Sequence, residues 1–479
     1  MARKIRKAAV IGSGIMGGGI AALLAGAGVD VLLLDIVPFD LKDEEKNDPA
    51  ARNRIVQGGL DAALQSNPSL FMSKRDAVRI EIGNLEDDIE KLKECDWICE
   101  VVVENLNIKR DLFSKVEKLR KKDAIVSTNT SGIPLQDITE GFSDDFKQHF
   151  MGTHFFNPVR YMHLLELIPG AETLPEVLRF MAKFGEKHLG KGIVWAKDTP
   201  NFVGNRIGVQ GIGKIMQAMV EENMTIPEVD AIFGPALGRP KTAIFKTVDL
   251  VGLDTMVHVC KNSYDLCPDD EQRDTLVMPD FVNKMVENNL LGNKTKAGFY
   301  KTDLTPEWKK DRKVINPDTL EYEKLERPTF PCLDEAKKKE TLEEKVKTVL
   351  YGDDKGAKFA WKMVVNGFQY AACRVPEIAD TVVEIDNAMK WGYNFEMGPF
   401  EMWDAAGVKE SVEKMEKEGF EVPQNVKTML DKGFTSFYKL ENGVRYFYDF
   451  VSSSYKKVPV SESEISLAAA KGNDKTVFE

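Results

Sequence analysis

Two short apolar runs and a glycine-rich turn between them dominate the first forty residues. Lys7–Ile11 and Val31–Asp35 are almost wholly apolar, and we predict that both are buried strands of a parallel sheet. Between them we predict a helix at Ile20–Ala27 and a turn that begins at Gly28. A strand, a helix and a second strand in this order indicate the first unit of an α/β domain.

Apolar runs of the same kind return farther along the chain. The polar segment Lys42–Leu92 is expected to be a mainly helical excursion, and strands are predicted at Trp97–Val103 and Ala124–Ser127. His149–Phe156 and Met162–Ile168 then predict two strands joined by a proline-containing turn. Such a hairpin would place its polar residues opposite one another.

The rest of the chain has a helical pattern that occurs twice. Residues from Asn201 to about Asn289 contain Asp230 and Asp249 in similar surroundings to those of Asp386 and Asp404. This looks like an internal duplication of a helical domain. In the second copy, Trp361 and Lys362 stand where the first has Asn205 and Arg206, so we interpret the second copy as a packing partner and not as a second site.

The glycine-rich turn has the spacing of a dinucleotide-binding loop. Gly12 would allow a tight turn, Gly14 a close approach of pyrophosphate, and Gly17 close packing of helix and strand. Asp35 would bind the ribose 2′-hydroxyl, and because no Arg follows it, NAD is preferred to NADP. The alternative is a glycine-rich turn in an unrelated sheet. The cofactor contacts predicted at this end are Gly12, Gly14, Ile15, Met16, Gly17 and Asp35.

These patterns predict an α/β Rossmann-type NAD-binding domain followed by an all-α helical domain present in two copies. The predicted division is residues 1–198 for the NAD-binding domain, 199–301 for the first helical domain, 302–354 for a charged linker, 355–435 for the second helical repeat and 436–479 for a C-terminal tail.

Composition excludes some classes of function. The 479 residues carry a net charge of −11, which argues against a nucleic-acid partner because phosphate binding relies on clustered Lys and Arg. The basic start of the chain imitates a signal peptide, but glycines interrupt the apolar run after it. No apolar stretch is long enough to span a membrane. The six cysteines are irregularly spaced, so we expect no disulfide framework, no metal site and a cytoplasmic location.

The candidate chemistry lies between residues 129 and 206. His154 is flanked by Phe, and Glu166 lies among Leu, so burying either is costly unless the two are paired. Such a pair holds the imidazole in one tautomer and suits it to take a proton from a substrate hydroxyl. Ser131 and Asn205 would bind the substrate oxygen as it becomes a carbonyl. The alternative is a hydrogen-bonded histidine of the core.

With these residues the chain resembles the L-3-hydroxyacyl-CoA dehydrogenase family, closely over residues 1 to 300 and more loosely to about 435. The motifs that carry the resemblance are Gly12-x-Gly14-x-x-Gly17, Val103-Glu104-Asn105, Asn129-Thr130-Ser131, His154-Phe155-Phe156-Asn157-Pro158, Glu166, Asp198-Thr199-Pro200 with Asn205-Arg206, and Lys294-Thr295 before Gly298-Phe299-Tyr300.

The resemblance implies an NAD enzyme of fatty-acid β-oxidation that oxidises (3S)-3-hydroxyacyl-CoA to 3-oxoacyl-CoA. It implies Ser131, His154, Glu166 and Asn205 as catalytic residues, with Asp35, Glu104, Lys109, Asn157 and Lys294 as further cofactor contacts. The chain departs from the family at Asn201 and at Lys296-Ala297, where glycine is usual, and these changes are expected to affect two turns without removing a proton-transfer group.

The resemblance also bears on the oligomeric state, the domain partners and the substrate of this chain. Single-copy members of the family pair through their helical domains, so a fused second copy would leave this chain monomeric through that surface. Larger members carry an enoyl-CoA hydratase domain, which is not visible here, and the chain is a candidate for the dehydrogenase part of a longer protein. A free 3-hydroxy acid dehydrogenase and a non-catalytic NAD-binding scaffold remain as alternatives. The preferred acyl length cannot be predicted.

Overall fold

The computed structural model describes residues 3–304 and 309–460. The chain divides after Phe202 into two compact units, the first ending at Phe202 and the second beginning at Val203. Within the described ranges, no helix is both long enough and apolar enough to cross a membrane.

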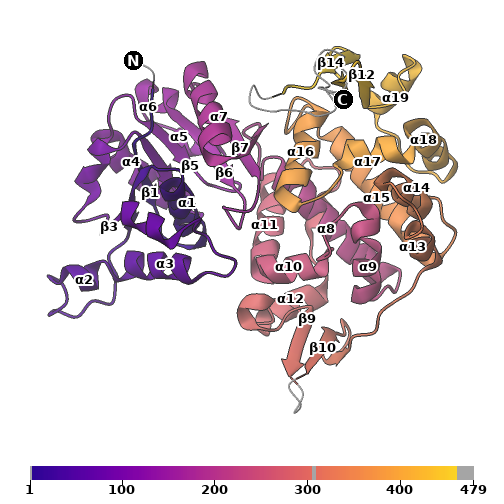
Figure 1. The fold of residues 1–479 in the computed structure, drawn as a ribbon, viewed down its shortest axis with the longest axis horizontal. Helices are drawn as coiled ribbons and strands as arrows, with labels where there is room; N and C mark the ends of the chain where they lie inside the picture. Colours follow the sequence, from indigo (N-terminus) through magenta and orange to yellow (C-terminus); the bar gives the residue numbers. More distant parts are fainter. Residues whose placement is uncertain (1–2, 305–308, 461–479) are drawn as a thin grey trace, which may run out of the picture. The chain divides into compact units, whose positions relative to one another are not determined.

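The first unit is built on one eight-stranded sheet with the order β3-β2-β1-β4-β5-β6-β7-β8 (Figure 1). Neighbouring strands are parallel except β6 and β7, which form an antiparallel pair. The strands are β1 (Lys7–Ile11), β2 (Asp30–Asp35), β3 (Ile80–Asn84), β4 (Trp97–Glu100), β5 (Ile125–Thr128), β6 (Phe150–Phe155), β7 (Leu164–Pro169) and β8 (Gly192–Trp195).

Helices connect these strands. They are α1 (Ile15–Gly26), α2 (Pro49–Arg52), α3 (Arg54–Gln65), α4 (Leu106–Leu119), α5 (Leu135–Thr139), α6 (Asp144–Gln148) and α7 (Pro175–Leu189), with the 3₁₀ helices η1 (Lys74–Arg79) and η2 (Ile89–Glu94). The predicted strand–helix–strand unit is present, but α1 begins at Ile15, five residues before the prediction. Three of the first five residues of α1 are glycine, which disfavours a helix. The spacing of apolar residues therefore did not show where this helix begins.

Two strands of this sheet, β3 and β8, were not predicted. β3 lies inside the segment Lys42–Leu92, which was expected to be mainly helical, and it pairs in parallel with β2 from Val31 opposite Ile80 to Asp35 opposite Asn84. It is an edge strand that alternates buried Ile80 with exposed Glu81. Charged residues lie on both sides of this short segment of alternating buried and exposed residues, so the sequence pattern did not indicate a strand.

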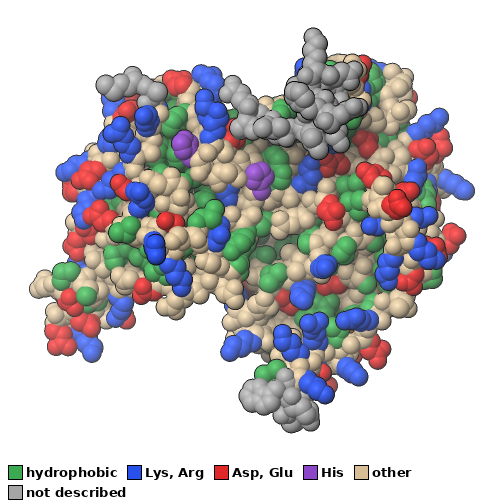
Figure 2. Space-filling view, viewed as in Figure 1, with side chains coloured by type: hydrophobic (Ala, Val, Ile, Leu, Met, Phe, Trp, Pro, Cys, Tyr) green, Lys and Arg blue, Asp and Glu red, His purple; other side chains and the backbone are tan. Residues whose placement is uncertain are grey.

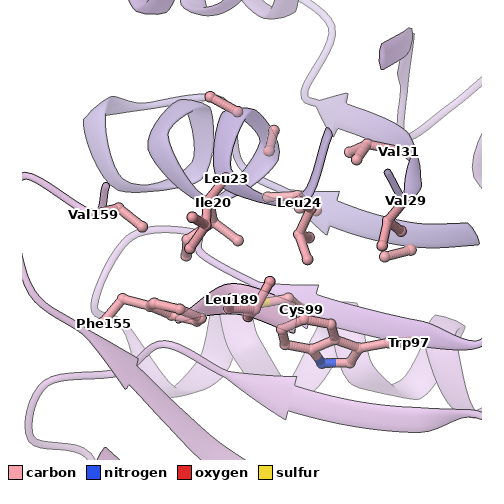
Figure 3. Close-up of a cluster of buried hydrophobic side chains, with 14 of the residues drawn as sticks. Ile20, Leu23, Leu24, Val29, Val31, Trp97, Cys99, Phe155, Val159 and Leu189 are labelled. Atoms are coloured by element: carbon pink, nitrogen blue, oxygen red, sulfur yellow. The ribbon is translucent and has the colours of Figure 1, made fainter. Parts of the chain in front are cut away.

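The core of the first unit lies between α1 and the sheet (Figure 3). Ile20 and Leu24 of α1 face Trp97 and Cys99 of β4, and all four side chains are buried. The indole Nε1 of Trp97 donates a hydrogen bond of 2.9 Å to the hydroxyl of Ser127, which satisfies its polar atom inside the core. This packing fixes the sheet whose strand ends carry the candidate site.

The second unit is mainly helical. Its helices are α8 (Gly204–Glu221), α9 (Ile226–Ile232), α10 (Phe245–Val251), α11 (Leu253–Leu266), α12 (Asp280–Glu287), α13 (Pro331–Ala336), α14 (Leu342–Leu350), α15 (Lys355–Cys373), α16 (Val382–Tyr393), α17 (Pro399–Ala406), α18 (Val408–Lys417) and α19 (Gln424–Asp431), with η3 (Pro235–Leu237), η4 (Arg273–Leu276) and η5 (Asn293–Thr295).

Two small sheets complete this unit. They are formed by β9 (Tyr300–Leu304), β10 (Lys310–Ile315) and β11 (Tyr322–Lys324), and by β12 (Tyr438–Glu441), β13 (Val444–Asp449) and β14 (Ser454–Lys457). The segment predicted as a charged linker therefore contains strands and the helices α13 and α14. α14 buries Val346, Val349 and Leu350, so part of this charged segment belongs to the core. The tail beyond residue 460 lies outside the described residues.

The aspartates that suggested a duplication make the same hydrogen bonds twice. Asp230 accepts from the amides at the start of α10 and from the hydroxyl of Tyr300. Asp386 accepts from the amides at the start of α17 and from the hydroxyl of Tyr438. Each aspartate thus joins the start of a helix to the first strand of the small sheet that follows it in the chain.

Space-filling views show how the charged residues are distributed on the surface. On the face drawn in Figure 2, acidic and basic side chains are interspersed over both units.

The six cysteines are all free, and five of them are buried.

Candidate active site

The glycine loop between β1 and α1 has the shape that its sequence predicted. Gly12 has φ of +106°, and a Cβ there would lie 2.5 Å from the carbonyl oxygen of Val101. A Cβ on Gly17 would lie 1.8 Å from the carbonyl oxygen of Gly12. By contrast, a Cβ on Gly14 would meet nothing within 4 Å, so the backbone is open to an approaching group there.

The open backbone lies at the N-terminus of α1. Gly14 is the N-cap residue, and it leaves the first amides of the helix without a side-chain cap or an acidic residue in the first turn. Unpaired amides and the positive end of the helix dipole favour an anion such as a pyrophosphate. Ile15 is 75% exposed at this end, and Met16 is partly buried.

Asp35 ends β2 beside this loop. Its carboxylate accepts hydrogen bonds from the amide of Ser13 at 2.6 Å, from the hydroxyl of Ser13 at 2.6 Å and from the amide of Ile36 at 2.7 Å. The open glycine, the uncapped helix and a carboxylate at the end of the second strand together fit a dinucleotide with a free ribose hydroxyl.

A buried ionic network lies at the carboxyl end of β4. Lys109 Nζ bonds to both carboxylate oxygens of Glu100, at 2.8 and 3.0 Å, and lies 3.3 Å from Glu104. Glu100 and Lys109 are fully buried. Burial raises the pKa of Glu100, although the charge of Lys109 acts in the opposite direction. Sequence reasoning missed Glu100, whose only signal was an acid at the end of an apolar strand.

Glu104 holds the loop that carries Ser131. One of its oxygens accepts hydrogen bonds from the hydroxyl of Thr130, from the amide of Ser131 at 3.0 Å and from the amide of Gly132 at 3.2 Å. Burial alone would raise the pKa of Glu104, but the charge of Lys109 and the hydrogen bond from Thr130 keep it below its usual value. Glu104 and Lys109 were predicted as cofactor contacts, and the structure places both in this internal network.

His154 and Glu166 lie opposite each other in the β6–β7 hairpin, as the sequence predicted. His154 Nδ1 lies 2.6 Å from Glu166 Oε2, and both side chains are buried. The imidazole packs edge-on against Phe156 and tilted against Phe202, with ring centroids 4.7 and 5.5 Å away. With Nδ1 donating to a carboxylate, Nε2 is the nitrogen that carries the basic lone pair in the neutral ring.

The loop that follows β6 has a second support that the sequence did not reveal. Lys191 is buried and donates to the carbonyl oxygen of Met162 at 2.6 Å and to that of Val159. Burial lowers the pKa of Lys191 to about 8. Asn157, a predicted cofactor contact, is exposed in this loop. The strand pair thus fixes His154, and Lys191 fixes the turn beyond it.

Asn205 and Lys294 belong to the second unit. Asn205 lies in the first turn of α8, and the hydroxyl of Tyr393 on α16 is 3.4 Å from its side-chain oxygen. Lys294 forms an ion pair with Asp254. Burial would raise the pKa of Asp254, but the hydrogen bond from Lys294 lowers it overall.

The two departures from the family occupy glycine-like conformations. Asn201 has φ of +62° and Lys296 has φ of +61°, both in the left-handed region that favours glycine. Asn tolerates this conformation better than most residues, and the polar side chain of Asn201 is buried. Both residues thus adopt a backbone conformation that glycine adopts more readily.

The parallel sheet, the open glycine loop and the buried imidazole–carboxylate pair define a dinucleotide-dependent dehydrogenase. Comparisons with known proteins agree. The family model described as "3-hydroxyacyl-CoA dehydrogenase, NAD binding domain" matches residues 7–199. The model described as "3-hydroxyacyl-CoA dehydrogenase, C-terminal domain" matches two segments, residues 202–302 and 359–442. The chain belongs to the 3-hydroxyacyl-CoA dehydrogenase family.

Individual relatives support this assignment. A probable 3-hydroxyacyl-CoA dehydrogenase of Bacillus subtilis is 47% identical over 98% of this chain and 59% of its own length. A putative fatty acid oxidation complex trifunctional enzyme of Rickettsia felis is 37% identical over 84% of this chain and 53% of its own length. This chain therefore spans little more than half the length of either relative.

The fold also has a solved counterpart. The crystal structure of 3-hydroxybutyryl-CoA dehydrogenase from Escherichia coli aligns with a TM-score of 0.65 at 21% identity, over 90% of this chain and 99% of that one. The predictions of an NAD-dependent enzyme of this type and of NAD as its cofactor are confirmed by the family and its NAD-binding domain.

Proposed function

We propose that this chain oxidises the 3-hydroxyl of a (3S)-3-hydroxyacyl-CoA to a 3-oxoacyl-CoA, as a step of fatty-acid β-oxidation. The C3–H bond breaks with its electron pair and the O–H bond loses a proton, so one hydride and one proton leave the substrate. The glycine loop and Asp35 would hold NAD, which would supply the hydride acceptor. The protein has to orient the alcohol and take the proton.

His154 is the proposed acceptor of that proton, and its pairing with Glu166 is the observation that carries the proposal. A carboxylate 2.6 Å from Nδ1 keeps the proton on that nitrogen and leaves Nε2 to act as the base. Once the ring is charged, Glu166 stabilises the imidazolium inside an apolar setting. A core histidine would need a hydrogen-bond partner, but it would not need a carboxylate.

Ser131 and Asn205 are proposed to bind the substrate oxygen. Ser131 lies on the loop after β5, and the network around Glu104 fixes the backbone of that loop. Groups held in place before the reaction stabilise the developing charge without reorganising. Asn157 and Lys294 are proposed as further contacts to the cofactor.

A coupled absorbance assay separates this function from its two alternatives. NADH formation from 3-hydroxybutyryl-CoA, and little from free 3-hydroxybutyrate, would support the proposal. The reverse preference would indicate a free 3-hydroxy acid dehydrogenase. If neither compound yields NADH while NAD still binds, the chain is a non-catalytic NAD-binding scaffold.

Replacing Asp35 with Ala should weaken NAD binding, because the ribose hydroxyl loses its acceptor and the Ser13 amide loses its partner. A hydrogen bond to a charged group contributes about 1.5–3 kcal/mol, so we expect NAD affinity to fall by roughly ten- to a hundredfold. Titration of NAD by fluorescence measures this, with Asp40→Ala on an exposed loop as the control. Equal affinities in the wild-type and Asp35→Ala proteins would contradict the assignment.

We also infer that the helical part of the chain is a duplicated domain, with boundaries near residues 199–301 and 355–435. Support comes from the two segments matched by one family model and from the repeated aspartate geometry. The second copy then occupies the place of a partner subunit, and we expect the chain to be monomeric through that surface. Light scattering tests this, and a dimer held together through α8 to α12 would contradict it.

Two further expectations concern the setting of the enzyme. A trifunctional relative suggests that a hydratase domain or subunit acts beside this dehydrogenase. Free cysteines throughout the described chain favour a cytoplasmic location.

A further inference from the structure

A cavity lies inside the second unit, between the two segments matched by the same family model. Its walls come from α8 and the residues before α10 on one side, and from α15, α16 and the start of α17 on the other. Figure 1 shows these helices packed together. The cavity has a volume of about 80 Å³, whereas a single water needs roughly 10–15 Å³. It therefore has room for a short chain of several carbon atoms.

The walls are mainly apolar, with Ile207, Ile212, Val364, Phe368, Met389 and Met402 among them. Two glycines face the space from opposite helices. A Cβ on Gly211 of α8 or on Gly367 of α15 would meet nothing within 4 Å. Glycine inside a helix costs about 0.5–1 kcal/mol relative to alanine, and alanine would fit at both positions. Glycine at these two positions therefore leaves the cavity unfilled and lowers the stability of the two helices.

One cation lines this apolar space. The guanidinium of Arg239 lies between the rings of Phe233 and Phe395, 4.9 and 4.7 Å from their centroids. Its buried Nε has no hydrogen-bond partner. Over the described part of the chain, no carboxylate lies within 4.0 Å of this group. Burial lowers its pKa to about 10, so it remains charged at neutral pH.

The absence of a counter-ion distinguishes Arg239, which is partly buried, from Arg206 and Arg374, which are buried. Arg206 and Arg374 both bond to Asp270, and Glu377 lies within reach of both. A buried charge is costly unless it is paired. Arg239 is stabilised by two aromatic rings, and the N–H donors at the edge of its guanidinium plane are suited to a carboxylate brought by a ligand.

The cavity also borders a residue of the proposed catalytic set. Gly208 lines the cavity and lies three residues after Asn205 on α8, which is about one helical turn. Tyr393 lines it too, and its hydroxyl is 3.4 Å from the side-chain oxygen of Asn205. The cavity thus lies about one helical turn from Asn205, and the ring of Tyr393 packs against Gly208 between the two.

We propose that this cavity receives the acyl tail of the substrate and that Arg239 binds a carboxylate at the end of that tail. The preferred substrate is then a short 3-hydroxyacyl-CoA whose acyl chain ends in a carboxylate. This inference rests on the proposed dehydrogenase function. The phosphates of coenzyme A are a poor match for the cavity, because Arg239 is its one basic lining residue and the other walls are largely apolar.

Three thioesters test the proposal with the whole chain and NAD: 3-hydroxybutyryl-CoA, 3-hydroxyhexanoyl-CoA and 3-hydroxyadipyl-CoA. The last two have six acyl carbons and differ in the terminal carboxylate. We expect wild-type kcat/KM to be higher for the adipyl than for the hexanoyl thioester. Arg239→Gln should lower the adipyl value by roughly thirtyfold or more, as for loss of one partner of a buried charge pair. The hexanoyl value should change far less.

Two variants serve as controls. Lys241→Gln removes an exposed positive charge from the same loop and should leave all three values unchanged. Arg239→Lys keeps a charge and should retain part of the adipyl preference. If Arg239→Gln does not fold, Gly367→Met supplies the test, because its side chain fills the cavity and should lower kcat/KM more for the six-carbon thioesters than for 3-hydroxybutyryl-CoA.

The possible outcomes are distinct. If wild-type protein oxidises the neutral thioesters and shows no preference for the adipyl thioester, or if Arg239→Gln lowers both six-carbon values equally, the carboxylate site is overturned and the dehydrogenase function stands. If no thioester yields NADH, the proposed function fails, and this inference fails with it.

Discussion

Replacing His154 with Gln is expected to lower turnover by about 10²–10⁴-fold, the usual contribution of a general base. Gln keeps an amide that can donate to Glu166, so the hairpin should remain folded, but it has no basic nitrogen at the position of Nε2. NAD affinity should change little, because the glycine loop and Asp35 bind the cofactor. Steady-state rates with 3-hydroxybutyryl-CoA and a NAD titration measure the two effects.

His163→Gln is the matched control. His163 lies at the exposed end of the same hairpin, and its ring bonds to the carbonyl oxygen of Gly190. Its turnover should stay within about twofold of wild type, as for most exposed positions. If His154→Gln retained full turnover, or lost NAD binding together with activity, His154 would be a structural residue.

Replacing Lys109 with Met is expected to destabilise the first unit by about 3–5 kcal/mol, the typical cost of removing one partner of a buried ion pair. Glu100 is fully buried and would lose the only cation bonded to it among the described residues. Changing Glu100 to Leu as well should recover part of this loss, because no fully buried carboxylate is then left without a cation, although Glu104 still loses its contact with Lys109. Urea unfolding of the single and double variants measures this.

The same experiment distinguishes two roles for Lys109. Lys115→Met, on the exposed face of α4, should change the free energy of unfolding by no more than about 0.5 kcal/mol. A Lys109→Met protein that unfolds like wild type but binds NAD weakly would show that Lys109 contacts the cofactor directly and that the buried network contributes little to stability.

The part of the site that could be predicted from the sequence depends on local geometry. A hairpin with a short turn brings residues equally far from that turn into register, so His154 and Glu166 could be paired from the pattern alone. The glycine loop is equally local, because each glycine is required by a neighbour within the same strand–helix unit.

Other features depend on contacts between distant parts of the chain. Nothing near Glu100 in the sequence shows that Lys109 turns inward to meet it, since an exposed lysine on α4 has the same local pattern. Arg239 is similar, because Phe395, whose ring lies against it, comes from the loop after α16, more than 150 residues later. The glycine-like conformations of Asn201 and Lys296 could be suspected from the family pattern, but only the backbone angles reveal them.

The most direct measurement of the central claim follows the hydride. (3S)-3-Hydroxybutyryl-CoA carrying deuterium at C3 is incubated with the protein and NAD, and the NADH formed is analysed by mass spectrometry. Transfer from C3 predicts NADH that carries one deuterium, together with acetoacetyl-CoA in equal amount. Unlabelled NADH, or no NADH under conditions where NAD binds, would contradict the account.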